Sequence, residues 1–316
     1  MSDILAKILS HYPENEAETI RRAFEFAKRV HDGQKRDSGE DYMFHPLQSA
    51  KILADLSLDY ETISAAMLHD VLEDSDTTPE DLEKEFGANI AFLVKAVTKL
   101  KNVNYSGEPS SAKATEGQER YIENFHKMIL ATAKDLRVVL IKLADRLHNL
   151  ETIETFKGNK ERIAKESLEV YAPLASRLGM GEIKGVIEDL AFPHIYPEDY
   201  KNLLAFVKNQ IEENKKYITN IKPTLEKTLK ENGIKFINIS ARAKHLYSLW
   251  RKLKKYDFNL ERIYDLVALR IIVPDVASCY ETLGILHKYW QPLPGRIKDY
   301  IALPKPNGYQ SLHTTV

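Results

Sequence analysis

Hydrophobic residues along the first part of the chain recur every three or four positions, with polar residues between them. In residues 17–33, Ile20, Phe24 and Ala27 share one face of an expected helix that stops at a glycine. The same period predicts five further helical segments, at 45–58, 60–75, 79–100, 119–153 and 160–179. Residues 1–195 are therefore predicted to form an all-α domain.

Two further segments complete the helical part of the chain, one without helical periodicity and one that follows the all-α domain. Residues 102–118 are rich in Ser, Gly and Ala with mixed polarity, which predicts a mobile loop. Residues 196–232 are again periodic and stop at Gly233, so they are predicted to form a helical connector.

After the connector, the pattern changes to the two-residue alternation of β-strands. Strands are predicted at 234–240, at 263–273 and, as two strands joined by a Pro/Asn/Gly turn, at 299–316, with helices at 244–256 and 277–290. We therefore predict an α/β domain over 233–316. Because the last strand pattern stops at Val316, we expect this domain to lack its end.

Composition indicates the class of protein and its cellular compartment. Hydrophobic residues make up 43% of the chain and charged residues 29%, as in soluble globular proteins. The single cysteine, Cys279, excludes a disulfide framework and a cysteine-rich zinc site. The first residues lack a signal-peptide pattern, and no apolar run reaches the roughly 18 residues that span a bilayer. We expect a cytoplasmic protein without a membrane partner.

The net charge of −1 hides an asymmetry between the two parts. Residues 1–200 carry 25 Lys and Arg against 36 Asp and Glu, whereas residues 201–316 carry 20 against 10. An acidic part suits cation binding and a basic part suits phosphate-rich ligands, although a solvated surface alone gives the same imbalance.

The stretch AAMLHDVLEDSD, residues 65–76, places four ionisable side chains inside an apolar helix pattern. His69 and Glu73 are four residues apart on the expected helix. Asp70 and Asp74 have the same spacing, so the four side chains occupy adjoining faces of two turns. Buried charge is costly unless a metal, a partner or a substrate compensates it. The stretch is therefore a candidate wall of a metal site.

Two other segments offer ligands of the same kind. Asp145 lies in the apolar stretch RVVLIKLADRL, where an unpaired carboxylate would be costly, and Asn149 and Thr152 share its helix face. His45 directly precedes Pro46, a favourable first helical residue, so it stands at a helix start. Two histidines and two aspartates suit Mn²⁺, Fe²⁺ or Zn²⁺ better than a thiolate-preferring metal.

Such a metal polarises a phosphoryl oxygen and activates water. Glu73 and Asp74, one turn beyond the candidate ligands, are placed to orient or deprotonate that water. The alternative is that His45 and His148 are ordinary, partly buried histidines and that the carboxylates are solvated.

The basic part of the chain carries groups that suit phosphates and nucleotide bases. Lys244 and Lys252 share a basic helix face, which in most proteins is merely solvated. Asp265 opens a predicted strand beside this helix, where a carboxylate could hold Mg²⁺ against a triphosphate. The last predicted strands add an aromatic ring among phosphate-seeking groups: Arg296, Lys298, Lys305, Asn307, Tyr309 and His313.

His45, the His69-Asp70 pair and Asp145 match the ordered H…HD…D signature of HD-domain phosphohydrolases. The segments HDGQKRDSGEDYMFHPLQSA, AAMLHDVLEDSD, KLADRLHNLETI and YAPLASRLGMGEIKGVIEDLAF closely resemble the N-terminal half of the long RelA/SpoT homologues. These are bifunctional enzymes that make and degrade the alarmone (p)ppGpp in the stringent response. The resemblance covers essentially the whole chain.

The resemblance implies a multidomain fold. An all-α HD-type hydrolase domain would occupy 1–195, a helical connector 196–232, and the first part of a mixed-sheet, nucleotidyltransferase-like α/β synthetase domain 233–316. The regulatory C-terminal domains of the family, which would make any ribosome or tRNA contacts, are not in the sequence. The pattern does not indicate an oligomeric state.

For the hydrolase, the resemblance implies that one Mn²⁺ is held by His45, His69, Asp70 and Asp145. The acidic pair that supports water attack on the 3′-pyrophosphate bond would be Glu73 and Asp74. The substrate would be contacted by Arg36 and Ser38 at the guanine and by Asn149 and Thr152 at the ribose-phosphate. Two residues depart from the family pattern: Asp37 replaces a lysine and Glu151 an arginine, so the mouth of the pocket is less basic than usual.

For the synthetase, the resemblance implies transfer of pyrophosphate from ATP to the 3′-hydroxyl of GDP or GTP. Arg242, Lys244 and Lys252 match residues that contact the ATP phosphates. Asp265 matches the Mg²⁺ ligand and Tyr309 the residue that stacks on the acceptor guanine. RIKD, residues 296–299, is the basic form typical of bifunctional members. The catalytic glutamate of the family lies beyond SLHTTV, so we expect synthetase activity of this chain to be lost or crippled.

The leading hypothesis is therefore Mn²⁺-dependent hydrolysis of (p)ppGpp to GDP or GTP and pyrophosphate. The first alternative is a GTP pyrophosphokinase with a silent hydrolase half, which should have lost the His69-Asp70 pair. The second is a non-catalytic nucleotide-binding fragment. An HD phosphodiesterase acting on nucleic acid is disfavoured because the acidic part lacks a basic groove.

Overall fold

The computed structural model of the chain describes residues 1–101, 134–259, 263 and 266–316. The predicted loop over 102–118 and the beginning of the predicted helical segment 119–153 lie outside the described residues. The described chain divides into two compact units, Met1–Ile163 and Ala164–Val316.

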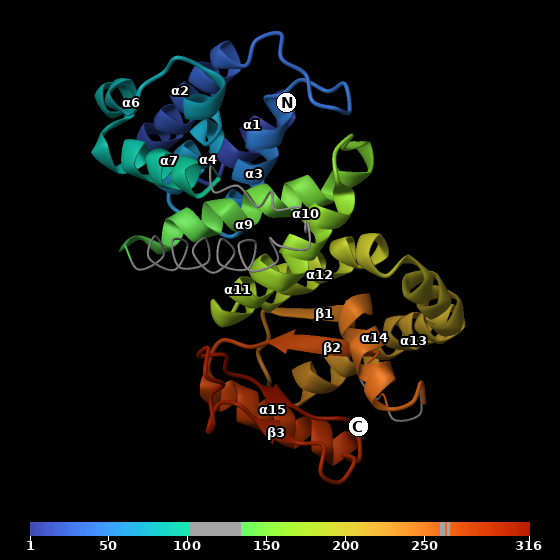
Figure 1. The fold of residues 1–316 in the computed structure, drawn as a ribbon. Helices are drawn as coiled ribbons and strands as arrows, with labels where there is room; N and C mark the ends of the chain where they lie inside the picture. Colours follow the sequence, from blue (N-terminus) through green and yellow to red (C-terminus); the bar gives the residue numbers. More distant parts are fainter. Residues whose placement is uncertain (102–133, 260–262, 264–265) are drawn as a thin grey trace. The chain divides into compact units, whose positions relative to one another are not determined.

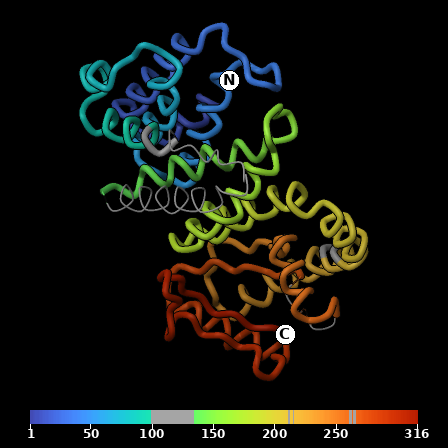
Figure 2. The backbone as a smooth tube through the Cα atoms, viewed as in Figure 1, coloured from blue at the N-terminus to red at the C-terminus, as the bar shows by residue number. Residues whose placement is uncertain are grey.

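The first unit is built from helices (Figure 1), whose backbone Figure 2 traces from blue to green. Its described elements are α1 (Ser2–Leu9), α2 (Glu14–Val30), α3 (Phe44–Asp55), α4 (Tyr60–Leu68), α5 (Val71–Asp74), α6 (Pro79–Phe86), α7 (Ala88–Lys101), α9 (Leu136–Glu151) and the 3₁₀ turn η1 (Ile153–Thr155). Helix α10 (Lys160–Glu166) includes the division between the two units at Ile163.

Helix α4 forms the centre of this unit and packs against α2, α3, α7 and α9. Every residue from Thr62 to Leu68 is buried, which is expected of a helix covered on all sides. Its apolar side chains join those of the surrounding helices in one core that includes Ile20, Leu47 and Leu93. Because α4 is held on all sides, the residues that follow it are fixed in position.

The structure corrects the prediction of one helix over 60–75. The helix ends at Leu68, His69 and Asp70 form a turn, and α5 begins at Val71. His69 Nδ1 lies 2.7 Å from Ala66 O, the carbonyl that would accept from the Asp70 N–H in an uninterrupted helix. The predicted helix over 79–100 is likewise divided, at Gly87, whose φ of 86° suits glycine.

The second unit combines helices with short strands. Its elements are the π-helical turn η2 (Ser167–Tyr171), α11 (Ala172–Arg177), α12 (Gly181–Ile195), α13 (Pro197–Glu231), β1 (Asn238–Ala243), α14 (Leu246–Lys255), β2 (Val267–Ile272), α15 (Val276–Tyr289), β3 (Lys298–Asp299) and β4 (Leu312–His313). In the described residues, β1 pairs antiparallel with β2, and β3 pairs antiparallel with β4.

The predicted fold class, a helical part followed by a part with helices and strands, is confirmed. The predicted connector is the long helix α13. The first strand forms later than predicted, at Asn238, and the last two strands are only two residues each. The domain limits at 195 and 232 stay a prediction. Among the described residues, no helix has the length and apolar character needed to cross a membrane.

A close contact at Gly185 fixes the start of α14 against α12. His245 Nδ1 bonds to Asp189 Oδ2 at 2.8 Å, and the Tyr247 N–H donates to Asp189 Oδ1 at 2.9 Å. This arrangement holds the His245 imidazole directly over Gly185, where a Cβ atom would overlap the ring. Glycine is therefore required here by lack of space.

We expect Gly185→Ala to lower the free energy of unfolding by about 1–3 kcal/mol, because the held His245 ring cannot move away freely. Gly181→Ala is the matched control on the same helix. A Cβ at Gly181 meets nothing within 4 Å, so this change should be neutral or slightly stabilising. Denaturant unfolding of both variants checks the prediction, and equal stabilities would contradict it.

Candidate metal centre and nucleotide-binding residues

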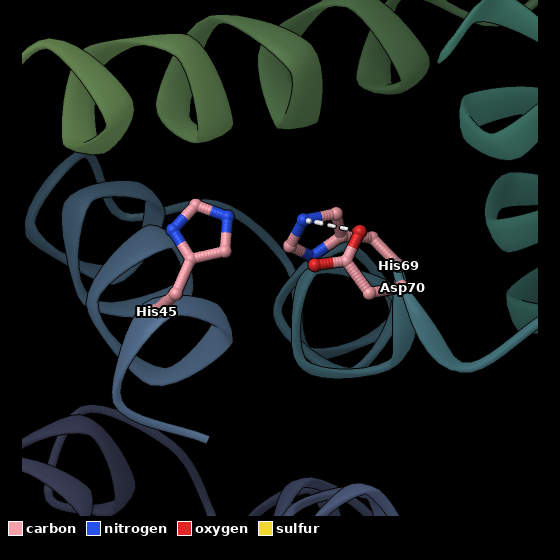
Figure 3. A group of neighbouring side chains, drawn as sticks. All are labelled: His45, His69 and Asp70. Atoms are coloured by element: carbon pink, nitrogen blue, oxygen red, sulfur yellow. Dashed lines mark ion pairs between the residues drawn. The ribbon is translucent and has the colours of Figure 1, made fainter. Parts of the chain in front are cut away.

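The candidate metal centre lies in the first unit. His45 stands in the first turn of α3, and His69 and Asp70 form the turn between α4 and α5. All three residues are buried, and each offers a ligand atom within 4.8 Å of the others. Figure 3 shows the His45 ring facing the His69-Asp70 pair across the space between them.

Asp145, on α9, faces the same group. Its Oδ1 lies 3.2 Å from His45 Nε2 and 3.9 Å from His69 Nε2. The second aspartate, Asp70, also contacts His69, with 3.3 Å between Asp70 Oδ1 and His69 Nε2. The four side chains proposed from the sequence as metal ligands therefore meet in one buried place, although they come from separate helical segments.

Hydrogen bonds on the outer side of both imidazoles fix which nitrogen carries the proton. His69 Nδ1 lies 2.7 Å from Ala66 O, which can only accept, so Nδ1 carries the hydrogen. His45 Nδ1 lies 2.7 Å from His148 Nδ1, which already accepts from Arg36 Nη1 at 3.3 Å, so His45 donates. In the neutral tautomer that these bonds select, Nε2 of each ring is the nitrogen that faces an aspartate.

Burial favours the neutral form of the His45 and His148 rings. It lowers the pKa of His45, an effect that neighbouring Asp145 opposes. Burial, together with the adjacent His45 and Arg36, lowers the pKa of His148 to about 3. Neutral imidazole is the form that binds a metal ion.

The outer oxygens of both aspartates are held by donors. Tyr42 OH donates to Asp70 Oδ2 at 2.9 Å, and burial followed by the Asp70 charge raises the pKa of Tyr42, which keeps the phenol protonated. Lys142 Nζ donates to the outer oxygen of Asp145, Oδ2, at 2.8 Å, and Asn149 Nδ2 donates to Oδ1, the oxygen that faces the histidines, at 2.6 Å. Burial would raise the pKa of Asp145, but Lys142 holds it well below its usual range.

The atoms that face one another inside the site are imidazole nitrogens and carboxylate oxygens. The two Nε2 atoms lie 3.2–3.9 Å from carboxylate oxygens, and His69 Nε2 has no hydrogen-bond partner among the described residues. A buried polar atom without a partner is costly, and a divalent cation would bind this nitrogen together with the neighbouring carboxylate oxygens. The residues present therefore fit a metal ion of the type bound by mixed nitrogen and oxygen ligands.

Tyr42, Lys142 and His148 also belong to this site and were not expected there from the sequence. Lys142 had a usable signal, because it precedes Asp145 by three residues and therefore shares its helix face. Tyr42 and His148 had none, since their partners lie 28 and 103 residues away.

Glu73 and Asp74, the expected water-handling pair, follow the site on α5. Their backbone N–H groups both donate to the Asp70 carbonyl, at 3.0 and 3.1 Å. Glu73 is half-buried, whereas Asp74 is more exposed and its Oδ2 lies 3.9 Å from Nδ1 of the buried His31. Both carboxylates are thus one helical turn from Asp70, and their catalytic role stays a prediction.

Three of the four expected substrate contacts of the hydrolase meet beside the centre. Arg36 Nη2 donates to Asn149 Oδ1 at 2.9 Å, and Arg36 Nη1 donates to Thr152 Oγ1 at 3.3 Å. Ser38 instead donates to Glu40 Oε2 at 3.1 Å within its own loop. The guanidinium of Arg36 therefore lies at the edge of the metal centre.

The two residues that depart from the family pattern lie around α9. Asp37 Oδ2 accepts from the Lys157 N–H at 3.1 Å, which ties its loop to the segment after η1. Glu151 ends α9, and burial raises the pKa of its carboxyl while Lys51 opposes that shift.

In the second unit, several expected nucleotide-binding residues gather around His313. Partial burial and the cations Lys305, Lys298 and Arg242 lower the pKa of His313, and Lys298 of β3 is the partner of His313 in the β3–β4 pair. Tyr309 OH lies 3.1 Å from His313 Nε2, and Lys305 Nζ lies 4.5 Å from the centroid of the Tyr309 ring. A cationic cluster with an exposed aromatic ring suits a phosphate and a base.

The other residues of this unit that were expected to bind nucleotides make separate contacts. Arg242 pairs with Glu182 of α12 at 3.4 Å, and Asn307 Nδ2 donates to Ser176 O at 3.0 Å. Lys244 precedes α14 and Lys252 lies on it, both half-buried. Arg296, exposed, precedes β3, and Asp265 lies outside the described residues.

Comparisons with known proteins give matches along the chain. Residues 23–181 match the HD domain, and residues 241–316 match the region found in RelA / SpoT proteins. A guanosine-3′,5′-bis(diphosphate) 3′-pyrophosphohydrolase of Aquifex aeolicus (strain VF5) is 48% identical over 318 residues, covering 100% of this chain and 44% of the relative.

Two further relatives carry other names. A GTP pyrophosphokinase of Myxococcus xanthus is 44% identical over 310 residues, covering 98% of this chain and 40% of the relative. The bifunctional (p)ppGpp synthase/hydrolase SpoT of Escherichia coli (strain K12) is 44% identical over 310 residues, covering 98% and 43%. The chain thus spans less than half the length of these curated relatives.

Proposed function

We propose, since this chain belongs to the HD-domain family and is a RelA/SpoT homologue, that its first unit hydrolyses the 3′-pyrophosphate of (p)ppGpp. The products are GDP or GTP and pyrophosphate. The observation that supports this most strongly is the meeting of the Nε2 atoms of His45 and His69 with two aspartates in one buried place. These atoms can bind a divalent cation, and such a cation polarises a phosphoryl oxygen.

The ligands of the proposed metal are His45, His69, Asp70 and Asp145, and the proposed ion is Mn²⁺. A divalent cation held there supplies polarisation of a phosphoryl oxygen and a water of lowered pKa.

The chain supplies the remaining functions. Glu73 and Asp74, one turn from Asp70, orient or deprotonate the attacking water. Arg36, held by Asn149 and Thr152, presents a fixed cation to the anionic substrate at the edge of the site. No covalent intermediate is required, because the water itself attacks the phosphoryl group.

A second activity is proposed for the whole protein, transfer of pyrophosphate from ATP to GDP or GTP. The match of residues 241–316 to the RelA / SpoT region supports it, as does the cluster of Arg242, Lys298, Lys305 and Tyr309 around His313. Mg²⁺ with Asp265 as its ligand belongs to the same proposal. The expectation that this chain lacks full synthetase activity stays a prediction, which an assay of ATP-to-GDP transfer tests.

Release of labelled pyrophosphate from 3′-labelled ppGpp tests the hydrolase proposal. A chain stripped of metal with a chelator is expected to be inactive, and adding Mn²⁺ should restore release. Release that does not depend on metal would overturn the ligand assignment. Absence of release with Mn²⁺, Fe²⁺ or Zn²⁺, combined with ATP-to-GDP transfer, would favour a pyrophosphokinase with a silent hydrolase half.

Replacement of Arg36 is expected to weaken substrate binding more than chemistry. Arg36→Gln removes a charge-assisted contact, so the KM for ppGpp should rise by about 10- to 100-fold with a smaller change in kcat. Lys35→Gln, an exposed cation next to it in the loop, is the control and should change KM little. Steady-state kinetics decide between these results, and an unchanged KM for Arg36→Gln would exclude a substrate contact.

A further inference from the structure

Lys142 is a buried lysine in the middle of α9. Its exposed fraction is 5%, and it lies in a stretch of apolar residues that are all buried: Val138, Val139, Ile141, Leu143 and Ala144. Lysine is almost never fully buried unless it is paired. Its partner is Asp145, three residues further along the helix, with 2.8 Å between Nζ and Oδ2.

Stability alone does not explain this pair. Removing two charges from water costs several kcal/mol per ion, so a buried ion pair is often no more stabilising than apolar side chains of the same volume. Leu or Met at position 142 together with an apolar residue at 145 would continue the surrounding core. The charges are therefore better explained by a task of Asp145 that requires a fixed carboxylate.

The geometry shows what Lys142 does to that carboxylate. The ammonium occupies Oδ2, while Oδ1 is turned toward His45 Nε2 at 3.2 Å and His69 Nε2 at 3.9 Å and accepts from Asn149 Nδ2 at 2.6 Å. The χ2 torsion of an aspartate is broad, so a carboxylate without such a donor offers either oxygen, or both, to a cation. Tyr42 acts in the same way on Oδ2 of Asp70.

We propose that Lys142 is a positioning residue of the metal centre, which holds Oδ2 of Asp145 and presents Oδ1 alone to the bound cation. The inference rests on the proposed function, because it requires a metal at this site. Lys142 touches neither substrate nor metal, and its effect reaches the cation only through Asp145.

This role is tested by measuring the affinity of the chelator-treated full chain for Mn²⁺ alone. The EPR signal of free Mn²⁺ reports how much of the ion is unbound. Lys142→Met keeps the apolar stem and removes the ammonium, and it is expected to weaken Mn²⁺ binding by about 10- to 100-fold. Lys142→Arg retains a cation at Oδ2 and should recover part of the affinity. Lys51→Met, which removes the exposed partner of Asp55 on α3, is the matched control and should leave Mn²⁺ binding unchanged.

A double-mutant comparison shows whether the effect passes through Asp145, and it stays usable if Lys142→Met does not fold. The variant Lys142→Met/Asp145→Asn removes both buried charges and leaves neither unpaired. A positioning role predicts that it binds Mn²⁺ as weakly as Asp145→Asn alone. Weaker binding by the double variant would show a direct or fold-wide effect of Lys142 and overturn the proposal.

The results separate this inference from the proposed function. A folded Lys142→Met with unaltered or tighter Mn²⁺ binding overturns the positioning role while leaving the hydrolase proposal intact. An unaltered chain that binds Mn²⁺ but releases no pyrophosphate from ppGpp overturns the hydrolase, and the loss of affinity in Lys142→Met would still support the positioning role. Absence of Mn²⁺ binding by the unaltered chain overturns both.

Discussion

The Asp70→Asn variant is expected to lose hydrolysis of ppGpp by a factor on the order of a thousand or more, since a metal ligand is removed from the reacting centre. Asparagine keeps the size of the side chain and can still accept the hydrogen bond from Tyr42 OH. What it removes is the anionic oxygen that lies 3.3 Å from His69 Nε2. Asp145 would then be the remaining anionic ligand.

Two measurements establish the cause of that loss. Metal analysis of the purified variant should show that Mn²⁺ no longer co-purifies or binds, and thermal unfolding of the metal-free protein should show that the fold survives. Asp55→Asn changes an exposed aspartate on α3 and is expected to leave activity and metal content unaltered. If Asp70→Asn retains most of the activity, the His69-Asp70 pair is not part of the metal centre.

Glu73→Gln is expected to lower kcat for ppGpp by roughly 10²- to 10⁴-fold, the usual contribution of a general acid or base. Glutamine has the same shape as glutamate but cannot take a proton from water at neutral pH. Because Glu73 lies on α5, one turn beyond the ligands, its replacement should not alter Mn²⁺ binding. Parallel measurement of kcat and of the dissociation constant for Mn²⁺ distinguishes this role from that of a ligand.

The same assay tests whether Glu73 and Asp74 act together. Residues that act as a unit are not additive, so Glu73→Gln/Asp74→Asn should lose little more than the more severe single variant. Glu80→Gln, an exposed carboxylate on α6, serves as the control. A fall in Mn²⁺ affinity equal to the fall in kcat would assign Glu73 to the metal, and a normal kcat would exclude it from the chemistry.

The expected helix over 60–75 shows where periodicity fails. Hydrophobic spacing continues smoothly through His69 and Asp70, so it gives no sign of the turn that separates α4 from α5. The turn coincides with the bond from His69 Nδ1 to Ala66 O, a local bond between a side chain and the backbone. The four ionisable side chains therefore do not share one continuous helix: His69 and Asp70 form the turn, and Glu73 and Asp74 lie on α5.

The second unit shows a different limit. Alternation located the two strands that pair as β1 and β2, but it placed the start of the first too early, at residue 234 instead of Asn238. Strand ends depend on which residues find a partner across the sheet, and the pairing of Asn238 with Ile272 sets this one. The last two strands pair over only two positions, Lys298 with His313 and Asp299 with Leu312. The residues between them, 300–311, form turns and irregular chain.

The sequence by itself determined the residue types of the candidate site, the helical character of the first unit and the family resemblance. It did so because helix period, charged residues in apolar stretches and ordered motifs are all properties of neighbours along the chain. Only the tertiary structure decided which nitrogen of His45 faces inward, through His148, and which oxygen of Asp70 is held, through Tyr42. These contacts join residues 103 and 28 positions apart, and such contacts exist only after the helices have packed.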